Sequence, residues 1–296
     1  MLLPRTQIPI PCNTKTAPGR QTLTAQQLHL FQQFLAENEK SPATISKYVR
    51  ILLELQAWLG ERTLSRQTLT DYREALRLRH QAQTVNGKLC AINAYLTFAN
   101  LTEMRARLLK IQRRSFLPEK REMSESDYKQ LLKTAQKRND RLYHLMLTLG
   151  GTGIRVSELR FLTMEAVMQG RVEISMKGKT RTVLLPKELC QRLKAYAKRN
   201  DIAEGCIFRT RSGKPLDRSN ICHALKKLCD AAHVAKSKVY PHSFRHLFAR
   251  CFYAVEKNLV HLADVLGHSS IDTTRLYVMA SANVYQHTLN RMHLLI

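Results

Sequence analysis

The chain has 296 residues, with 48 Lys and Arg against 23 Asp and Glu, which gives a formal net charge of +25. Hydrophobic residues make up 44% of the chain, so its composition excludes a disordered basic tail. The sequence contains no run of about 18 apolar residues, so no membrane span is predicted, and prolines at positions 4, 9 and 11 interrupt any signal-peptide core. We therefore expect a cytoplasmic protein that binds a polyanion, with nucleic acid as the first candidate.

The positive charge is spread over both halves of the chain. Residues 1–118 contain 17 Lys and Arg against 7 Asp and Glu, and residues 119–296 contain 31 against 16. This distribution predicts two basic domains that face one long anion. The alternative is a basic protein that its charge merely keeps soluble.

The cysteines and histidines give little indication of a metal site. Seven cysteines occur, and no pair has the CxxC spacing of a zinc or redox motif. We expect reduced thiols, most of them buried. His242 and His246 lie four residues apart, as metal ligands on one helix face do, but the glutamate of an HExxH motif is missing. We therefore expect no metal there.

The first third of the chain is predicted to be an arm followed by a helical bundle. Residues 1–21 are rich in Pro and Thr and lack apolar periodicity, which predicts a flexible arm. Residues 22–112 repeat apolar residues at helical spacing, which is typical of a bundle of about four helices. In the segment SPATISKYVRILLELQAWLG, Ser41 is the candidate N-cap, Pro42 takes the first helical position, and Gly60 ends the helix. The other helices of the bundle are expected to begin at Thr24 and to cover 68–80 and 84–99.

A charged linker without periodicity, residues 113–123, leads into a second domain, residues 124–296. Ser124 and Asp127 form a predicted capping box at the start of its first helix. Residues 171–185 alternate around Lys177-Gly178-Lys179 and are the one clear strand signal, a β-hairpin. The other expected elements are helices at 141–149, ending at Gly150-Gly151, and at 187–199, 218–232, 243–255, 258–266 and 271–280. The predicted fold class is therefore mainly α with a small antiparallel β-sheet.

Two segments of the second domain place candidate charged residues beside a turn. TGIRVSEL puts Arg155 and Glu158 just after a glycine-rich stretch, where the backbone leaves room for a ligand to approach. An Arg and a Glu three residues apart are more often a surface ion pair. Lys177 stands at the tip of the hairpin in SMKGKTR, and such a slim tip can enter a DNA groove. The alternative for Lys177 is a solvated side chain.

Two later segments add histidines, an arginine and a tyrosine. In YPHSFRHLFA, Pro241 precedes a helix, so His242 and Arg245 share its first turns and can form an anion site with an acid–base group. The alternative is a solvated arginine and a core histidine. In LADVLGHSSIDTTRLYVMAS, His268 follows a helix-ending glycine, and Tyr277 comes nine residues later. A single tyrosine on an amphipathic helix is more often part of a core.

Together the four segments fit one chemistry. Two arginines, a lysine, two histidines and a tyrosine are able to surround one phosphodiester, because guanidinium forks match phosphate oxygens and stay charged. A tyrosine nucleophile needs neutralised phosphate charge and a proton acceptor, and a leaving alkoxide needs a proton donor. The four segments contain no carboxylate cluster for catalytic Mg²⁺ and no Walker glycine loop, which argues against metal-dependent nucleases and NTPases.

These motifs resemble those of the tyrosine recombinases, the phage-integrase family that includes the Xer, Cre and transposon integrases. TGIRVSEL matches the first-arginine box, HSFRH matches the His-x-x-Arg box, and LGHSSIDTTRLY matches the box from the second histidine to the nucleophile. The lysine hairpin fits in position, and residues 22–112 are similar to the family's core-binding domain. The resemblance covers nearly the whole chain. It implies a two-domain clamp with a helical, SAM-like core-binding domain and an α/β catalytic domain.

The resemblance also assigns roles to single residues. It implies that Tyr277 attacks the scissile phosphate and forms a 3′-phosphotyrosyl link, which leaves a free 5′-hydroxyl. Arg155 and Arg245 then stabilise the non-bridging oxygens, and Lys177 protonates the leaving 5′ oxygen, with Lys179 as its rival. Because the covalent link conserves the bond energy, the resemblance implies that neither ATP nor a metal is required.

The remaining roles come from the same resemblance. His242 is expected to serve acid–base chemistry around Tyr277, His268 to bind and position the phosphate, and Glu158 to support the arginine box. Tyr285 is a poor rival of Tyr277, because it misses the nine-residue spacing.

The resemblance further implies a partner, an assembly and a cellular role. The expected partner is double-stranded DNA with inverted-repeat core sites, bound by a homotetramer in which the tail, residues 278–296, docks on a neighbouring protomer. A directionality or accessory factor is a further expected partner. Val278-Met279 departs from the threonine and histidine that the family often has there, which weakens an assignment to the Xer group. The segment LVHLADVLGHSSIDTTRLY favours integration and excision of a mobile element, at the bacterial nucleoid.

Three alternatives stay open at this point. They are Xer-type resolution of chromosome or plasmid dimers, a non-catalytic DNA-binding relative, and a type IB topoisomerase. The presence of all six expected site residues argues against the non-catalytic relative. The compact two-domain length and the tail argue against the topoisomerase.

Overall fold

The computed structural model describes residues 23–111, 122–176, 179–268 and 270–278. The chain divides into two compact units, Met1–Arg113 and Arg114–Ile296, and each unit has its own hydrophobic core. The expected N-terminal arm and most of the expected linker lie outside the described residues.

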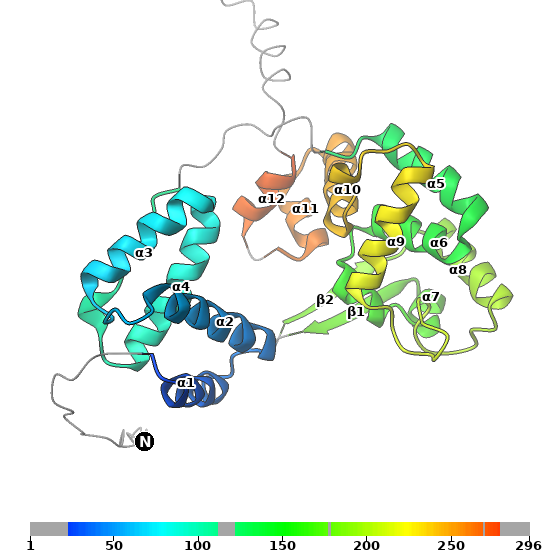
Figure 1. Ribbon diagram of the computed structural model, residues 1–296. Coiled ribbons are helices and arrows are strands. Elements are labelled where there is room, and N and C mark those ends of the chain that lie inside the picture. The colour runs from blue at the N-terminus through cyan, green and yellow to red at the C-terminus, as the bar shows by residue number, and fades with distance from the viewer. Residues whose placement is uncertain (1–22, 112–121, 177–178, 269, 279–296) are drawn as a thin grey trace, which may run out of the picture. The chain divides into compact units, whose positions relative to one another are not determined.

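Unit 1 is a bundle of helices, as the apolar periodicity predicts (Figure 1). The Ser41 side chain accepts a hydrogen bond from the Thr44 backbone, Pro42 opens the next helix, and Gly60 ends it with a positive φ of 56°. Leu52 and Phe31 are completely buried in the core between the helices. The elements are α1 (Ala25–Glu37), α2 (Pro42–Leu59), α3 (Arg66–Arg79), α4 (Ala82–Phe98) and the 3-10 turn η1 (Thr102–Met104).

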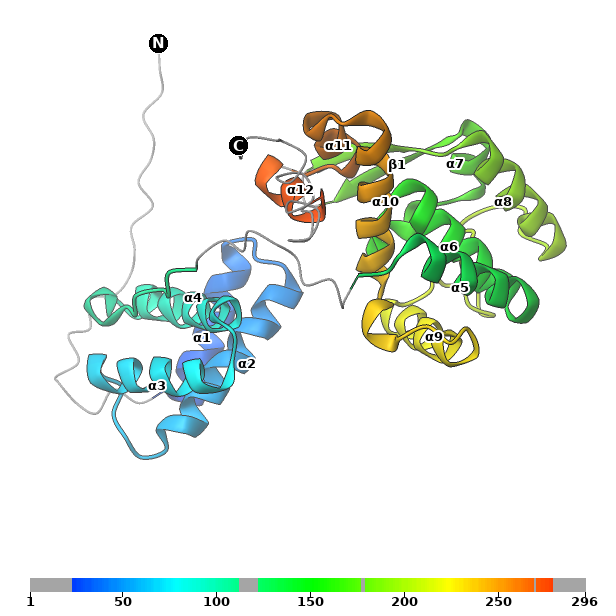
Figure 2. The same cartoon turned by 90° about the horizontal axis from the view of Figure 1, so that it is seen from above.

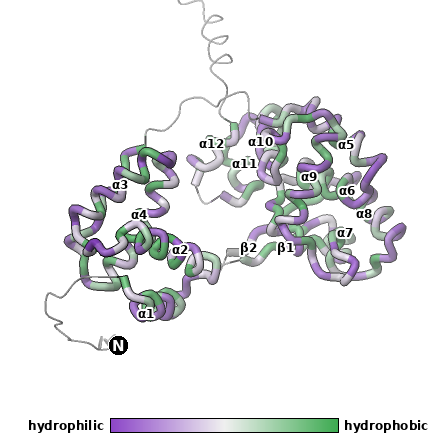
Figure 3. The backbone as a smooth tube through the Cα atoms, in the orientation of Figure 1, coloured by the Kyte–Doolittle hydropathy of each residue, from purple (hydrophilic) through white to green (hydrophobic). Residues whose placement is uncertain are grey.

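Unit 2 is mainly helical with one β-hairpin. Figure 3 shows apolar and polar residues alternating along its helices, the pattern of elements that cover a shared core. Its elements are α5 (Glu125–Arg138), α6 (Asp140–Thr152), η3 (Val156–Phe161), α7 (Met164–Gln169), β1 (Arg171–Met176), β2 (Lys179–Leu184), α8 (Lys187–Arg199), α9 (Arg218–Ala231), η4 (Lys236–Lys238), α10 (Pro241–Glu256), α11 (Leu259–Leu266) and α12 (Ile271–Val278).

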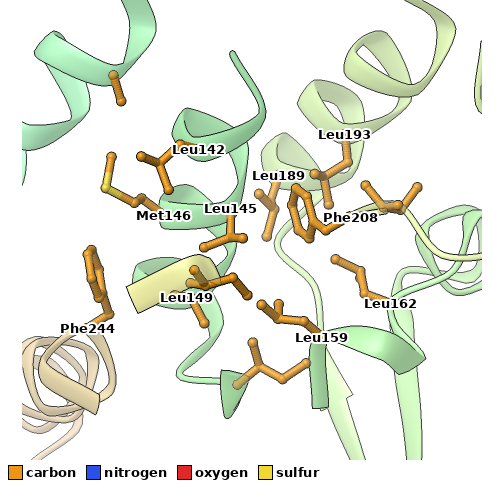
Figure 4. Close-up of a cluster of buried hydrophobic side chains, with 14 of the residues drawn as sticks. Leu142, Leu145, Met146, Leu149, Leu159, Leu162, Leu189, Leu193, Phe208 and Phe244 are labelled. Atoms are coloured by element: carbon orange, nitrogen blue, oxygen red, sulfur yellow. The ribbon is translucent and has the colours of Figure 1, made fainter. Parts of the chain in front are cut away.

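Helix α6 runs through the centre of unit 2 and carries much of its core (Figure 4). The expected end of this helix at Gly150-Gly151 is wrong, because the helix continues to Thr152 and ends at Gly153, where φ is +63°. Gly150 packs closely on Tyr128, since a Cβ there would lie 2.6 Å from the tyrosine hydroxyl. Tertiary packing therefore outweighs the low helix propensity of the two glycines.

The β-hairpin and the C-terminal helices complete unit 2. Strands β1 and β2 pair antiparallel, with Ile174 opposite Arg181, and the turn residues 177 and 178 lie outside the described residues. Helix α10 begins at Pro241, two residues earlier than expected, because proline fits the first helical position. It packs against α6 on one side and against α11 and α12 on the other (Figure 2). Within the described ranges, no helix is long and apolar enough to span a membrane.

Candidate active site

Arg155 and Glu158 form the first part of the site, at the left-handed turn after α6. The Arg155 guanidinium donates to Glu158 Oε1 at 2.9 Å, and the Arg155 backbone N–H donates to Oε2 at 2.8 Å. Glu158 is only 4% exposed. Burial alone would raise the pKa of Glu158, but hydrogen bonds from Arg181 and from the Arg155 backbone hold this pKa below its usual value. Glu158 is therefore buried and ionised, whereas the Arg155 side chain is 34% exposed, so the alternative of a fully solvated surface pair does not describe it.

Arg245 is the largest completely buried side chain of the described residues, at 1% exposure. Its guanidinium donates to the carbonyl of Gly153 at 2.6 Å and to the carbonyl of Leu266 at 2.5 Å. It also donates to Nε2 of His268 at 2.9 Å. Burial lowers the pKa of Arg245 to about 10, with the charge of Arg155 as a further cause. The side chain stays charged at neutral pH, and its Nε is buried without a hydrogen-bond partner.

His268 lies between Arg245 and Thr274, and these two neighbours determine its tautomer. A guanidinium has no acceptor, so Nε2 of His268 must be the unprotonated nitrogen that accepts from Arg245. Nδ1 then carries the proton and donates to the Thr274 hydroxyl at 2.8 Å. Burial, followed by the charge of Arg245, lowers the pKa of His268 to about 4, so the ring is neutral at physiological pH.

Tyr277 meets His242 at the centre of the site. The Tyr277 hydroxyl lies 2.7 Å from Nε2 of His242, and the tyrosine is only 7% exposed. Burial and the positive charge of Arg245 lower the pKa of His242, although part of its ring is open to solvent. A neutral His242 is able to accept the phenolic proton, so the two residues have the geometry of a nucleophile and its base.

His246 supports the tyrosine ring from α10, one turn after His242. The two rings stack with centroids 4.2 Å apart at an interplanar angle of 17°. Burial, together with the nearby His242, lowers the pKa of His246 to about 4. His246 is therefore a neutral stacking partner, and the described residues hold no group of three or more His, Cys, Asp or Glu that would bind a metal ion.

A pocket of about 450 Å³ opens beside the arginines. Its lining residues come from η3, the hairpin and the end of α11, and they are Arg155, Glu158, Ile174, Met176, Thr180, Arg181, Gly267 and His268. Lys177 and Tyr285 lie outside the described residues, and Lys179 lies at the strand end without a described side chain. Of the seven residues expected at the site, the structure thus brings six together and does not describe the seventh, Lys177.

Three further residues belong to the site and were missed by sequence reasoning: Arg181, His246 and Thr274. Arg181 shares a strand face with Val183, which is buried, so an arginine on the inward face of a predicted strand was a usable signal. Thr274 is completely buried, one helical turn before Tyr277. Thr273 and Thr274 are adjacent in the sequence, and no local pattern indicates which of the two is buried in the site.

Family models and curated relatives match most of the chain. The model of the phage integrase family matches residues 121–283, and that of the phage integrase N-terminal SAM-like domain matches residues 28–102. Tyrosine recombinase XerA of Pyrococcus furiosus is 27% identical over 281 residues, which cover 93% of this chain and 96% of the relative. XerA of Thermococcus kodakarensis is 30% identical over 257 residues, which cover 83% and 88%.

Solved structures share the fold at lower sequence identity. XerH recombinase bound to its difH substrate aligns with a TM-score of 0.68 at 17% identity, covering 90% of this chain and 84% of that one. The Tn1549 transposon integrase in complex with transposon right end DNA also aligns at 0.68, with 16% identity and coverages of 90% and 98%. The phage integrase model alone covers more than half of the chain, and the SAM-like model matches the residues before it. This protein therefore belongs to the phage integrase family and is a tyrosine recombinase.

Proposed function

We propose that this recombinase cuts and rejoins double-stranded DNA through a 3′-phosphotyrosyl link to Tyr277. The observation that carries the proposal is the contact of the Tyr277 hydroxyl with Nε2 of His242 at 2.7 Å. The guanidinium of Arg245 lies 6.0 Å from the centre of the same tyrosine ring. A nucleophile, a base and a cation for the phosphate charge thus meet within one unit.

In the proposed cleavage step, the Tyr277 oxygen attacks the scissile phosphorus while His242 takes the phenolic proton. The new bond joins the tyrosine oxygen to phosphorus, and the bond from phosphorus to the 5′ oxygen breaks. The leaving 5′ oxygen takes a proton from Lys177 and becomes a free hydroxyl. The reverse reaction with a 5′-hydroxyl of another strand rejoins the DNA. One phosphate ester replaces another, so the step balances without ATP.

Arg155 and Arg245 are proposed to neutralise the two non-bridging oxygens. Both guanidiniums are already held by hydrogen bonds in the free protein, so little ordering is needed when the phosphate arrives. The unpartnered Nε of Arg245 leaves one buried donor available. His268 is proposed to contact the phosphate as well. For this contact the ring proton moves from Nδ1 to Nε2, so Nε2 releases Arg245 and donates to a phosphate oxygen, while Nδ1 accepts from the Thr274 hydroxyl.

A nicked suicide substrate tests the proposed nucleophile. DNA selected by the protein from a random-sequence duplex library supplies the binding site, and a nick beside the scissile position prevents religation. The wild-type protein should form a covalent DNA complex that survives denaturing electrophoresis. Tyr277→Phe should form none, whereas the matched Tyr253→Phe, also a tyrosine of unit 2, should react as the wild type does. A covalent complex of undiminished yield with Tyr277→Phe would refute the proposal.

The role proposed for Lys177 is tested with a 5′-bridging phosphorothiolate at the scissile position. A thiol has a pKa of about 8.5, against about 16 for water, so a thiolate leaves without a proton donor. Lys177→Ala should cleave ordinary DNA poorly and the sulfur substrate as fast as the wild type. Lys179→Ala should cleave both. Rescue of Lys179→Ala instead would transfer the role to Lys179.

The DNA partner is proposed to carry inverted-repeat core sites that two basic domains bind together. Most lysines and arginines then contact backbone phosphates, and each such contact contributes about 0.9 to the log–log salt slope of binding. We propose a tetramer on DNA in which the tail, residues 278–296, docks on a neighbour, and residues 279–296 of this tail lie outside the described residues. Removing residues 284–296 should leave DNA binding intact and weaken synapsis, and an unchanged tetramer on DNA would contradict this.

Integration and excision of a mobile element is the cellular role that we propose, with action at the nucleoid in the cytoplasm and a directionality factor as a further partner. It is supported by the segment from Leu259 to Tyr277, which is similar to that of mobile-element integrases. Sequencing the DNA that flanks the gene tests it. Inverted repeats that bound a movable segment would support the role, and a single site near the replication terminus would favour dimer resolution.

A further inference from the structure

Three consecutive carbonyls at the end of α11 each contact a different arginine. The Val265 carbonyl accepts from Arg181 at 3.0 Å, and the next carbonyl, that of Leu266, accepts from Arg245 at 2.5 Å. The third, that of Gly267, accepts from Arg155 in a longer contact of 3.4 Å. The last carbonyls of a helix lack partners within it and form the negative end of its dipole. The end of α11 therefore gathers three guanidiniums around the segment that leads into His268.

Of these three arginines, only Arg181 has no role in the proposed cleavage step. Its Nη2 donates to Glu158 Oε2 at 2.6 Å, and its side chain is 16% exposed against 5% for that of Glu158. Glu158 accepts from Arg155 with its other oxygen at 2.9 Å. A single buried carboxylate thus lies between two guanidiniums, that of Arg155 at the start of η3 and that of Arg181 from the hairpin.

The Arg181 side chain also fills the space beside Gly267. A Cβ on Gly267 would overlap the Arg181 Cδ, and the backbone there has a φ of +62°. The arginine therefore touches the α11 segment twice, through the Val265 carbonyl and through the glycine that precedes His268. Both contacts are long-range in sequence, because strand β2 and helix α11 lie more than 70 residues apart.

We propose that Arg181 is a positioning residue for strand cleavage, which holds the Arg155 guanidinium in place through Glu158 and the His268 segment through Val265 and Gly267. This proposal rests on the proposed function. Its electrostatic part follows from charge balance: with Arg181 present, Glu158 is neutralised and Arg155 keeps a net positive charge for the phosphate. Without Arg181, the Glu158 carboxylate would pair with Arg155 alone through both carboxylate oxygens and would cancel the charge of Arg155.

Substitutions of Arg181 test the proposal in the full chain. Single-turnover cleavage of the nicked substrate is measured at saturating protein, together with the Kd for DNA. Arg181→Met should slow cleavage by about 10- to 100-fold while the Kd for DNA stays within about 2-fold, since misplaced groups impair the reaction more than binding. Arg181→Lys retains the charge but cannot bridge Glu158 and Val265 together. Its cleavage rate should therefore lie between those of the wild type and Arg181→Met. Arg171→Met removes an exposed arginine of the same hairpin and should cleave as the wild type does.

A methylphosphonate at the scissile position supplies a readout that a purely structural role would not change. This group lacks one charged oxygen, so its cleavage depends less on guanidinium charge. The defect of Arg181→Met should shrink on this substrate to a few-fold, because Arg181 acts by keeping Arg155 available to the charge. An equal defect on both substrates would overturn the proposal, as would wild-type cleavage by Arg181→Met. If Arg181→Met proves unfolded by circular dichroism, Arg181→Lys decides by the same two-substrate comparison.

Failure of the proposed function and failure of the positioning role give different results. A wild-type protein that never forms the Tyr277-linked complex refutes the proposed function itself. A wild-type protein that forms this complex while the Arg181 variants cleave both substrates normally refutes only the positioning role.

Discussion

His246 makes the stability of unit 2 depend on pH, because the groups packed around it favour its neutral form. Its ring stacks on Tyr277, and burial lowers its pKa from the ordinary histidine value of 6.5 to about 4. Between these two pH values, the unfolded chain binds a proton at position 246 and the folded chain does not. The contribution of His246 to the unfolding free energy is therefore present in full above about pH 6.5, and it is lost as the pH falls toward 4.

The size of the loss follows from the two pKa values. From pH 7 to pH 5, the wild-type unfolding free energy should fall by about 2 kcal/mol because of His246. Phenylalanine at this position retains the stacked ring and cannot titrate. The unfolding free energy of His246→Phe should therefore fall by about 2 kcal/mol less over the same range. His268 also has a pKa lowered to about 4, but it is present in both proteins and cancels in the comparison.

Urea unfolding at pH 7 and at pH 5, followed by circular dichroism, is the assay. The single tryptophan, Trp58, lies in unit 1, so its fluorescence identifies the transition of that unit and leaves the transition of unit 2 to be read separately. His223→Phe, at an exposed position of α9, is the matched control and should follow the wild-type pH dependence. An equal fall for wild type and His246→Phe would show that His246 is not neutral in the folded protein.

Two other substitutions and one pH profile test the same geometry. Arg245→Lys should lower the unfolding free energy by about 2–4 kcal/mol and abolish the covalent complex, because an ammonium cannot serve both buried carbonyls; a fully stable variant in urea would contradict this. Gly153→Ala should cost about 2–3 kcal/mol, since it combines a positive φ with a Cβ 2.5 Å from Phe248, whereas Gly213→Ala, with free space, should cost about 1 kcal/mol in the same titration. The cleavage rate of the wild type should stay level on acidification to below pH 6.5, because the pKa of His242 is lowered, and a fall already above pH 7 would exclude this histidine as the base.

Local signals account for the parts of the structure that the sequence predicts well. Ser41, Pro42 and Gly60 act on their own helix, so the bounds of α2 follow directly from them. The alternation around Lys177-Gly178-Lys179 sets the hairpin register in the same local way. Four sequence segments indicate the site residues, and the structure brings the described members of these segments together in unit 2.

Long-range contacts account for what the sequence does not predict. Helix α6 passes Gly150 and Gly151 because Tyr128, from the preceding helix, packs on Gly150. The partners of Arg181 lie on η3 and α11, and no local pattern links these segments. The buried position of Arg245 is of the same kind, because its carbonyl partners come from the end of α6 and the end of α11.

The most direct test of the proposed chemistry is to locate the protein–DNA bond. Trapped complex from the nicked substrate is digested with protease and nuclease, and mass spectrometry identifies the modified peptide. We predict a 3′-phosphonucleotide on the oxygen of Tyr277 and a free 5′-hydroxyl on the released strand. A bond to any other residue, or cleaved DNA with no protein attached, would contradict the role assigned to this tyrosine.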